Sequence, residues 1–191
     1  MATETLYDVW AKRNPKFETH FEETLLRQYA DYGVGASELT YAKGKIFGAG
    51  YEPYIYAFFL GLYAGGNGKR PLIGETKVLG HPIQFWEGSS DSKNGRKKYP
   101  KLREYIFTAL IAKTNELDLI ALEKGEVKVE NAVSMLINTM EQYANYGFHL
   151  IEDKLKDNPN YFYKTTGFLD MILDYVNPSS NEDGIEDLEE L

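Results

Sequence analysis

The chain has no cysteine, only three histidines among its 191 residues, and no long hydrophobic run. The absence of cysteine excludes disulfide bonds, thiolate metal sites and cysteine nucleophiles, and it is typical of proteins from a reducing cytosol. The longest apolar stretch, residues 54–64, is too short to cross a bilayer, which needs about 20 residues. The first residues also lack the apolar run of a signal peptide. We therefore expect a soluble, cytoplasmic protein without a membrane segment.

No complete catalytic or nucleotide-binding motif is present either. Residues 65–70 resemble a phosphate-binding loop, but that motif requires a glycine where Tyr63 stands and a hydroxyl where Arg70 stands. Residues 48–50 lack the strand–helix–strand context of a dinucleotide site. The nucleophile elbow of serine hydrolases is missing as well. We therefore expect no cofactor and assign no catalytic residue.

The three histidines, His20, His81 and His149, lie far apart in the sequence. His149 and Asp153 stand one helical turn apart, but two ligands do not make a metal site. We therefore predict that His149 forms an ion pair with a nearby acid, and we assign no metal ligand. The many acids would allow a carboxylate pair of the glycosidase kind, but nothing in the sequence singles out two of them.

Helical periodicity covers most of the chain. The first predicted helix spans residues 15–32, with Asn14 as its N-cap and Pro15 in its first turn. Its apolar face comprises Phe17, Phe21, Leu25, Leu26 and Tyr29. Further helices are expected over 37–47, 53–64, from Pro100 onward, 117–122, 129–155 and after Pro159. The spacing therefore predicts a mainly α fold, with a single helical domain over residues 1–176.

Residues 65–103 form a glycine-rich insert with nine Lys and Arg against three acids, although the chain as a whole carries −8. Two strands, 76–79 and 82–86, flank Gly80 and His81 and predict a small β-ribbon, and residues 88–94 read as a polar loop. Basic side chains with interleaved aromatics are typical of nucleic-acid binding. The predicted nucleic-acid-binding residues are Lys69, Arg70, Lys77, Lys93, Arg96, Lys97, Lys98, Lys101 and Arg103, with Trp86, Tyr99 and the adjacent Phe85 as stacking aromatics.

The last residues, 177–191, are strongly acidic and contain no base. Such a composition cannot bury enough apolar surface to fold by itself, so we expect a disordered tail. Pairing of the insert with this tail, or with a neighbouring subunit, is the alternative explanation of the basic charges.

The run AKGKIFGAGYEPYIYAFFLGLYAGG, residues 42–66, resembles the DndE family of bacterial DNA phosphorothioation (sulfur modification) proteins. A short helix, a glycine turn, a polar-proline start and an apolar helix follow one another there, ahead of Lys69 and Arg70. The segment up to Glu75 is also similar. This chain is longer than those proteins and lacks the arginine of their core helix. The resemblance implies a scaffold that binds DNA backbone and assembles with partner proteins, without a catalytic residue.

The leading hypothesis is therefore a non-enzymatic accessory subunit of a bacterial DNA-modification or phage-defence system. Its partners would be DNA and other subunits of that system. The alternative is a helical protein-interaction or homo-oligomerisation module without nucleic acid. A small carbohydrate- or nucleotide-active enzyme is the third possibility.

Overall fold

The computed structural model describes residues 4–30, 47–65, 68–86, 99 and 101–176. Strands β1 (Lys16–Glu18) and β2 (Thr76–Val78) form one antiparallel pair. The helical elements are α1 (Leu6–Ala11), a π-helical segment (Glu22–Leu26) leading into α2 (Arg27–Tyr29), α4 (Tyr51–Tyr63), the 3₁₀ turn η2 (Ile83–Phe85), α5 (Leu102–Lys113), α6 (Leu119–Glu123), α7 (Val129–Asp157), the 3₁₀ turn η4 (Tyr161–Tyr163) and α8 (Gly167–Val176). The predicted mainly α fold with a small β-ribbon is therefore confirmed.

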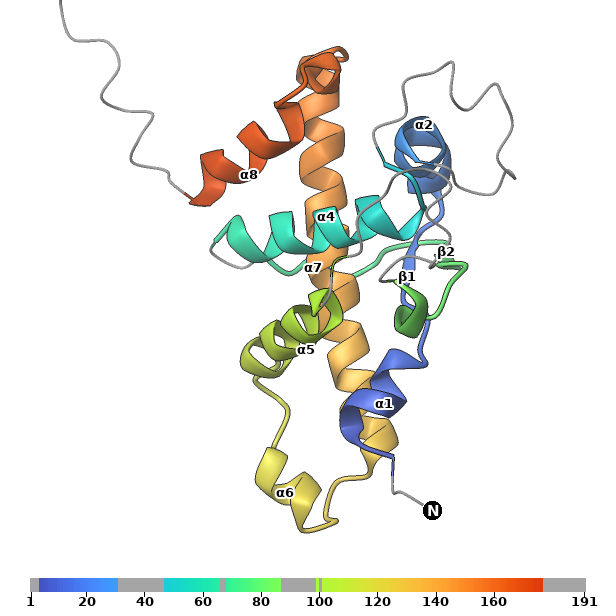
Figure 1. Ribbon diagram of the computed structural model, residues 1–191, viewed down its shortest axis with the longest axis vertical. Helices are drawn as coiled ribbons and strands as arrows, with labels where there is room; N and C mark the ends of the chain where they lie inside the picture. The colour runs from blue at the N-terminus through green and yellow to red at the C-terminus, as the bar shows by residue number, and fades with distance from the viewer. Residues whose placement is uncertain (1–3, 31–46, 66–67, 87–98, 100, 177–191) are drawn as a thin grey trace, which may run out of the picture.

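The long helix α7 is the central element and runs through most of the molecule (Figure 1). It begins at Val129, as predicted, and its apolar stripe is buried except for the half-buried Leu155. The stripe comprises Val133, Leu136, Met140, Tyr143, Phe148, Ile151 and Leu155. Helices α1, α4 and α5 and strand β1 all pack against α7. One hydrophobic core therefore extends from Trp10 to Met171.

Helix α4 crosses α7 steeply near its middle (Figure 1). The crossing is close because both helices place a glycine there. A Cβ on Gly147 would overlap the carbonyl of Ala57, with the carbonyl carbon only 2.5 Å away. A Cβ on Gly61 would overlap the carbonyl of Tyr143 in the same way. The two helices therefore pack backbone against backbone, and Phe58 of α4 is fully buried beside the crossing.

The first predicted helix is wrong over its N-terminal half. Asn14 does not cap a helix, because its side-chain amide donates to the carbonyl of Leu79 at 2.8 Å. The following residues form β1, in which Lys16 pairs with Val78 and Glu18 with Thr76. Hydrogen bonds to the distant segment 75–83 therefore override the local helical signal. Within the described residues, the helical part of this prediction extends only from His20 to Tyr29, although Phe17, Phe21, Leu25 and Leu26 are buried as predicted.

The predicted ribbon is correct in its first strand and wrong in its partner. Strand β2 pairs with β1 and not with residues 82–86. Those residues form the turn η2, in which the amides of Phe85 and Trp86 donate to the carbonyls of Pro82 and Ile83 at 3.0 Å. With this turn, the side chains of Ile83 and Trp86 are buried in the core.

The ends of the fold are helical as well. Thr5 and Asp8 form a reciprocal capping box that starts α1, an element the sequence interpretation missed. Helices α5, α6 and α8 lie where periodicity predicted them.

Within the described ranges, no helix combines the length and the apolar composition needed to cross a membrane. Most of the predicted helix over 37–47, the loop over 88–94 and the tail over 177–191 lie outside the described residues.

Candidate functional site

Two exposed aromatic side chains mark the ends of the most basic part of the insert. Residues 87–98, called the basic segment below, contain Lys93, Arg96, Lys97 and Lys98 and lie outside the described residues. Phe85, just before the segment, is 61% exposed, and Tyr99, just after it, is 63% exposed. Aromatic rings of this kind can stack on unpaired bases. The described residues on either side of the basic segment therefore provide two solvent-exposed aromatic rings.

The side chain of Trp86, in contrast, is not exposed to solvent. It is only 1% exposed, and its indole N–H donates to the carbonyl of His81 at 3.0 Å. Its ring stacks on Tyr51 and meets Tyr54 edge-on, with centroids 6.0 and 5.7 Å away. The prediction that Trp86 stacks on a base is therefore wrong, and Phe85 next to it faces solvent instead.

Arg103 connects the two ends of the basic segment. Its Nη1 donates to the carbonyl of Gln84 at 2.9 Å, so the start of α5 is held against η2. Arg103 therefore helps to hold together the two elements on either side of the basic segment, η2 and α5. Lys101 precedes α5 with an exposed side chain and a left-handed backbone, at φ 71°. Of these two predicted residues, Lys101 is the one whose side chain faces solvent.

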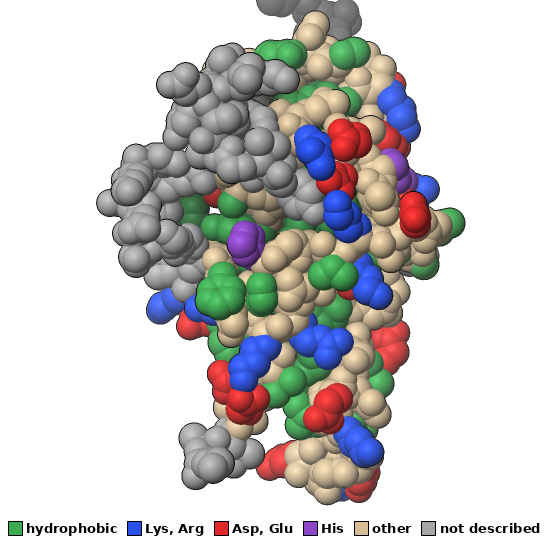
Figure 2. All heavy atoms as spheres, turned by 90° about the vertical axis from the view of Figure 1, so that its right-hand side faces the viewer, with side chains coloured by type: hydrophobic (Ala, Val, Ile, Leu, Met, Phe, Trp, Pro, Cys, Tyr) green, Lys and Arg blue, Asp and Glu red, His purple; other side chains and the backbone are tan. Residues whose placement is uncertain are grey.

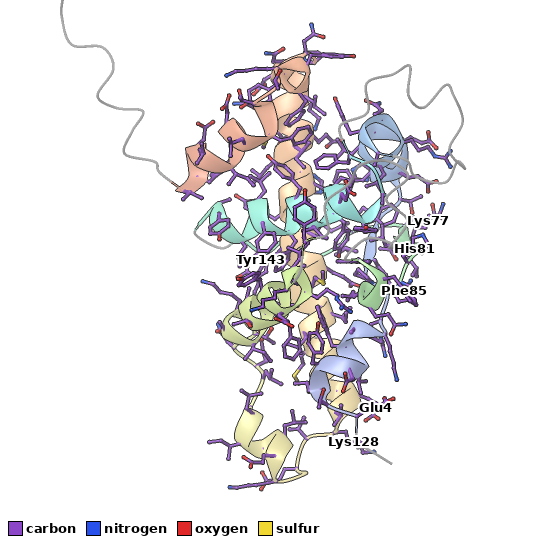
Figure 3. All side chains as sticks on the ribbon, viewed as in Figure 1. Glu4, Lys77, His81, Phe85, Lys128 and Tyr143 are labelled. Carbon is purple, nitrogen blue, oxygen red and sulfur yellow. The ribbon has the colours of Figure 1, made fainter. Side chains whose placement is uncertain are left out.

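Lys77 stands beside a pocket of about 480 Å³ at the edge of the ribbon. Figure 3 shows Lys77, His81 and Phe85 along the same side of the molecule. Lys77 and Arg27 both donate to Glu22 in the pocket wall. These hydrogen bonds, with Lys77 contributing most, hold the pKa of Glu22 below its ordinary value. Arg27 also forms an ion pair with Glu23, with its Nε 2.9 Å from Oε1 of Glu23. Two cations and two carboxylates therefore stand together beside the pocket.

Lys69 lies away from this edge. The Lys69 ammonium stands 5.7 Å from the centroid of the Tyr143 ring, and Figure 3 shows Tyr143 on the other side of α7 from Phe85. The backbone amide of Arg70 donates to the carbonyl of Gln142 on α7 at 3.1 Å. The structure therefore does not gather all the predicted cations on one surface.

Figure 2 shows the face that lies at the right of Figure 1. Basic and acidic side chains stand next to one another on its described part, so no patch of a single sign forms there.

A second cluster brings together two histidines and two carboxylates on another part of the fold. His20 follows β1, while His149 and Glu152 share one face of α7 at a spacing of three residues. Nε2 of His20 lies 3.8 Å from Oε1 of Glu152, and Nδ1 of His149 lies 3.9 Å from Oε2. Glu18 stands on the other edge of both rings, with its Oε2 3.6 Å from Nδ1 of His20 and 3.4 Å from Nε2 of His149.

The charges of this cluster follow from burial and hydrogen bonding. Burial lowers the pKa of His149 below its ordinary value of 6.5; Arg70 adds to this, and the nearby carboxylates oppose it without reversing it. Burial alone would raise the pKa of Glu18, but hydrogen bonds from the Ile73 amide and the Asn145 side chain outweigh it. The pKa of Glu18 is therefore lowered. At neutral pH, His149 is neutral and Glu18 is ionised.

The sequence interpretation missed this cluster. It considered His149 with Asp153, but Asp153 accepts a hydrogen bond from Lys156 at 3.1 Å instead. The nearer acid on the same helix face is Glu152, so the signal in the sequence was the spacing H-x-x-E within a predicted helix. His20 could not be added, because β1 was predicted to be helical. Comparison with protein-family models, with curated proteins and with solved structures finds no match to the chain.

Proposed function

We propose that the chain is a cytoplasmic, non-enzymatic accessory subunit of a bacterial DNA-modification or phage-defence system, and that it binds nucleic acid through the basic segment. The observation that carries the proposal is the exposure of Phe85 and Tyr99 at the two ends of that segment. Cations neutralise phosphates, and exposed rings stack on bases that are not paired. The resemblance of residues 42–75 to the DndE family supports the choice of system.

The described residues on either side of the basic segment support the same proposal. Trp86 is anchored in the core, and Arg103 holds the start of α5 to the carbonyl of Gln84. Both ends of the basic segment therefore leave the body at a fixed place. Lys77 and the pocket beside it lie on the same side of the molecule as Phe85 (Figure 3). A nucleic acid on the segment would meet both aromatic rings and, next to them, this pocket.

Anisotropy titration of labelled single-stranded, duplex and nicked DNA at low salt tests this function. We expect single-stranded DNA to bind most tightly, with a slope of log K against log salt of about −0.7 for each phosphate contact. The double variant Lys97→Glu/Lys98→Glu is expected to weaken binding by at least tenfold for every sequence. The control is Lys124→Glu/Lys128→Glu, which changes two exposed lysines beside α6 and should bind as the wild type does. Absence of binding to all three DNAs, or equal losses in both variants, contradicts the proposal.

Homo-oligomerisation is a second candidate function, favoured by one face of α8. Leu169, Leu173 and Val176 follow one another at helical spacing and are all exposed. A second copy of the chain could cover this apolar stripe by a self-complementary contact. Light scattering is expected to show a dimer for the wild type and a monomer for Leu169→Lys/Leu173→Lys. A monomeric wild type at high concentration contradicts this candidate.

A further inference from the structure

We propose that His20, His149 and Glu152 bind one divalent transition-metal ion of the zinc type. Each side chain offers one ligand atom, and the three atoms all lie within 4.8 Å of one another. With metal–ligand bonds of about 2.0–2.2 Å, ligand atoms of a tetrahedral site stand roughly 3.4 Å apart. Both imidazole nitrogens that face Glu152 are 3.8 and 3.9 Å from its oxygens. Small side-chain rotations therefore suffice to close a site around an ion.

The position of Glu18 is what distinguishes this cluster from an ordinary surface ion pair. Its Oε2 faces Nδ1 of His20 and Nε2 of His149, the nitrogens that point away from Glu152. In metal sites, a ligating histidine commonly donates its other ring N–H to a carboxylate, which fixes the tautomer and the ring orientation. One carboxylate here stands behind both rings. If both rings donate these N–H groups to Glu18, the remaining nitrogens present their lone pairs toward Glu152.

Glu18 is itself held rigidly. It is buried, and its other oxygen, Oε1, accepts hydrogen bonds from the Ile73 amide at 2.8 Å and from Nδ2 of Asn145 at 2.9 Å. The buried Nε2 of His149 makes no hydrogen bond in the present ring orientation. A slight turn of that ring would aim Nε2–H at Glu18 and satisfy it. The turn that satisfies this nitrogen is therefore compatible with presenting the opposite nitrogen to an ion.

The ligand set selects the class of metal. Two imidazoles and one carboxylate suit Zn²⁺ and neighbouring divalent transition metals better than Ca²⁺ or Mg²⁺, which prefer oxygen ligands. The side chain of His20 is 45% exposed, so water can complete the coordination. Lys156 donates to Oε2 of Glu152 at 3.0 Å and would share this carboxylate with the metal. An ion would offset the negative charge of Glu18 and Glu152.

Isothermal titration of untagged, chelator-treated protein with Zn²⁺ tests the proposal, and Co²⁺ serves as a spectroscopic probe. We expect one Zn²⁺ per chain and visible Co²⁺ bands of a site with nitrogen ligands. His20→Ala and Glu152→Gln are expected to weaken binding at least 100-fold. The matched control is His81→Ala, which removes the third histidine of the chain and should bind as the wild type does.

Circular dichroism and thermal melting show whether each variant is folded. Glu18→Gln keeps all three ligands but removes the carboxylate behind the rings, and we expect it to weaken binding about 10–100-fold while the Co²⁺ bands persist at saturation. Absence of saturable 1:1 binding to the wild type overturns the proposal. Equal losses in His81→Ala and His20→Ala overturn it as well, because they would show adventitious binding. None of these results depends on DNA binding.

Discussion

Replacing Gly147 with alanine is expected to destabilise the protein by about 3 kcal/mol or more. The new Cβ would overlap the carbonyl of Ala57 and would stand 2.8 Å from its Cα, so the obstacle is backbone on both sides. Neither helix can relieve the overlap by turning a side chain. Helices α4 and α7 would have to separate at their crossing, which would loosen the packing around Phe58.

Chemical denaturation followed by circular dichroism measures this effect. The control is Gly80→Ala, because Gly80 has open space around its Cα and no left-handed backbone. Its free energy of unfolding should stay within about 0.5 kcal/mol of the wild-type value. Wild-type stability for Gly147→Ala would show that the helices do not approach as closely as described.

Adjacent aromatic residues of η2 are expected to give opposite results when each is replaced by alanine. Trp86→Ala removes a buried indole from its contacts with Tyr51 and Tyr54, and should cost roughly 3–5 kcal/mol of stability. Phe85→Ala removes an exposed ring and should change stability by less than about 0.5 kcal/mol. If the proposed function is correct, Phe85→Ala should nevertheless weaken binding to single-stranded DNA by roughly 5–150-fold, since one stacked base contributes about 1–3 kcal/mol.

Thermal or chemical melting and the anisotropy titration together separate these roles. Tyr163→Ala is the matched control for Phe85→Ala, because Tyr163 is an exposed aromatic on the distant turn η4. It should affect neither stability nor DNA binding. Equal stability losses for Phe85→Ala and Trp86→Ala would contradict the opposite orientations of the two rings.

Helices with strong, uninterrupted periodicity were predictable from the sequence. Helix α7 begins at the predicted residue and α4 lies within two residues of its predicted start, because each buries a stripe defined by local spacing. The segment 15–19 was not predictable in this way. Its apolar residues fit a helical face, but its backbone pairs with residues 75–83, and no local pattern indicates that partner.

The candidate sites depend on the same distinction. Composition identified the insert, including the exposed Lys101 and Tyr99. The opposite orientations of Phe85 and Trp86 could not be predicted, because they arise from a turn where a strand was expected. The histidine cluster needed the position of His20, which the β1–β2 pairing sets. Periodicity therefore located the helix that carries His149 and Glu152, and long-range pairing supplied the rest.

The central position of α7 also has a consequence for synthesis of the chain. Elements near the N-terminus complete their packing against a helix that is made much later: the amide of Lys16, for example, donates to Glu141, 125 residues further along. Trp10, Phe17 and Phe21 therefore have no finished core to enter while the nascent chain is short. Contacts of such separation slow folding, and exposed aromatic surface favours aggregation in the interval. Truncated chains that end before Val129 are accordingly expected to require chaperones or to precipitate, whatever the stability of the complete protein.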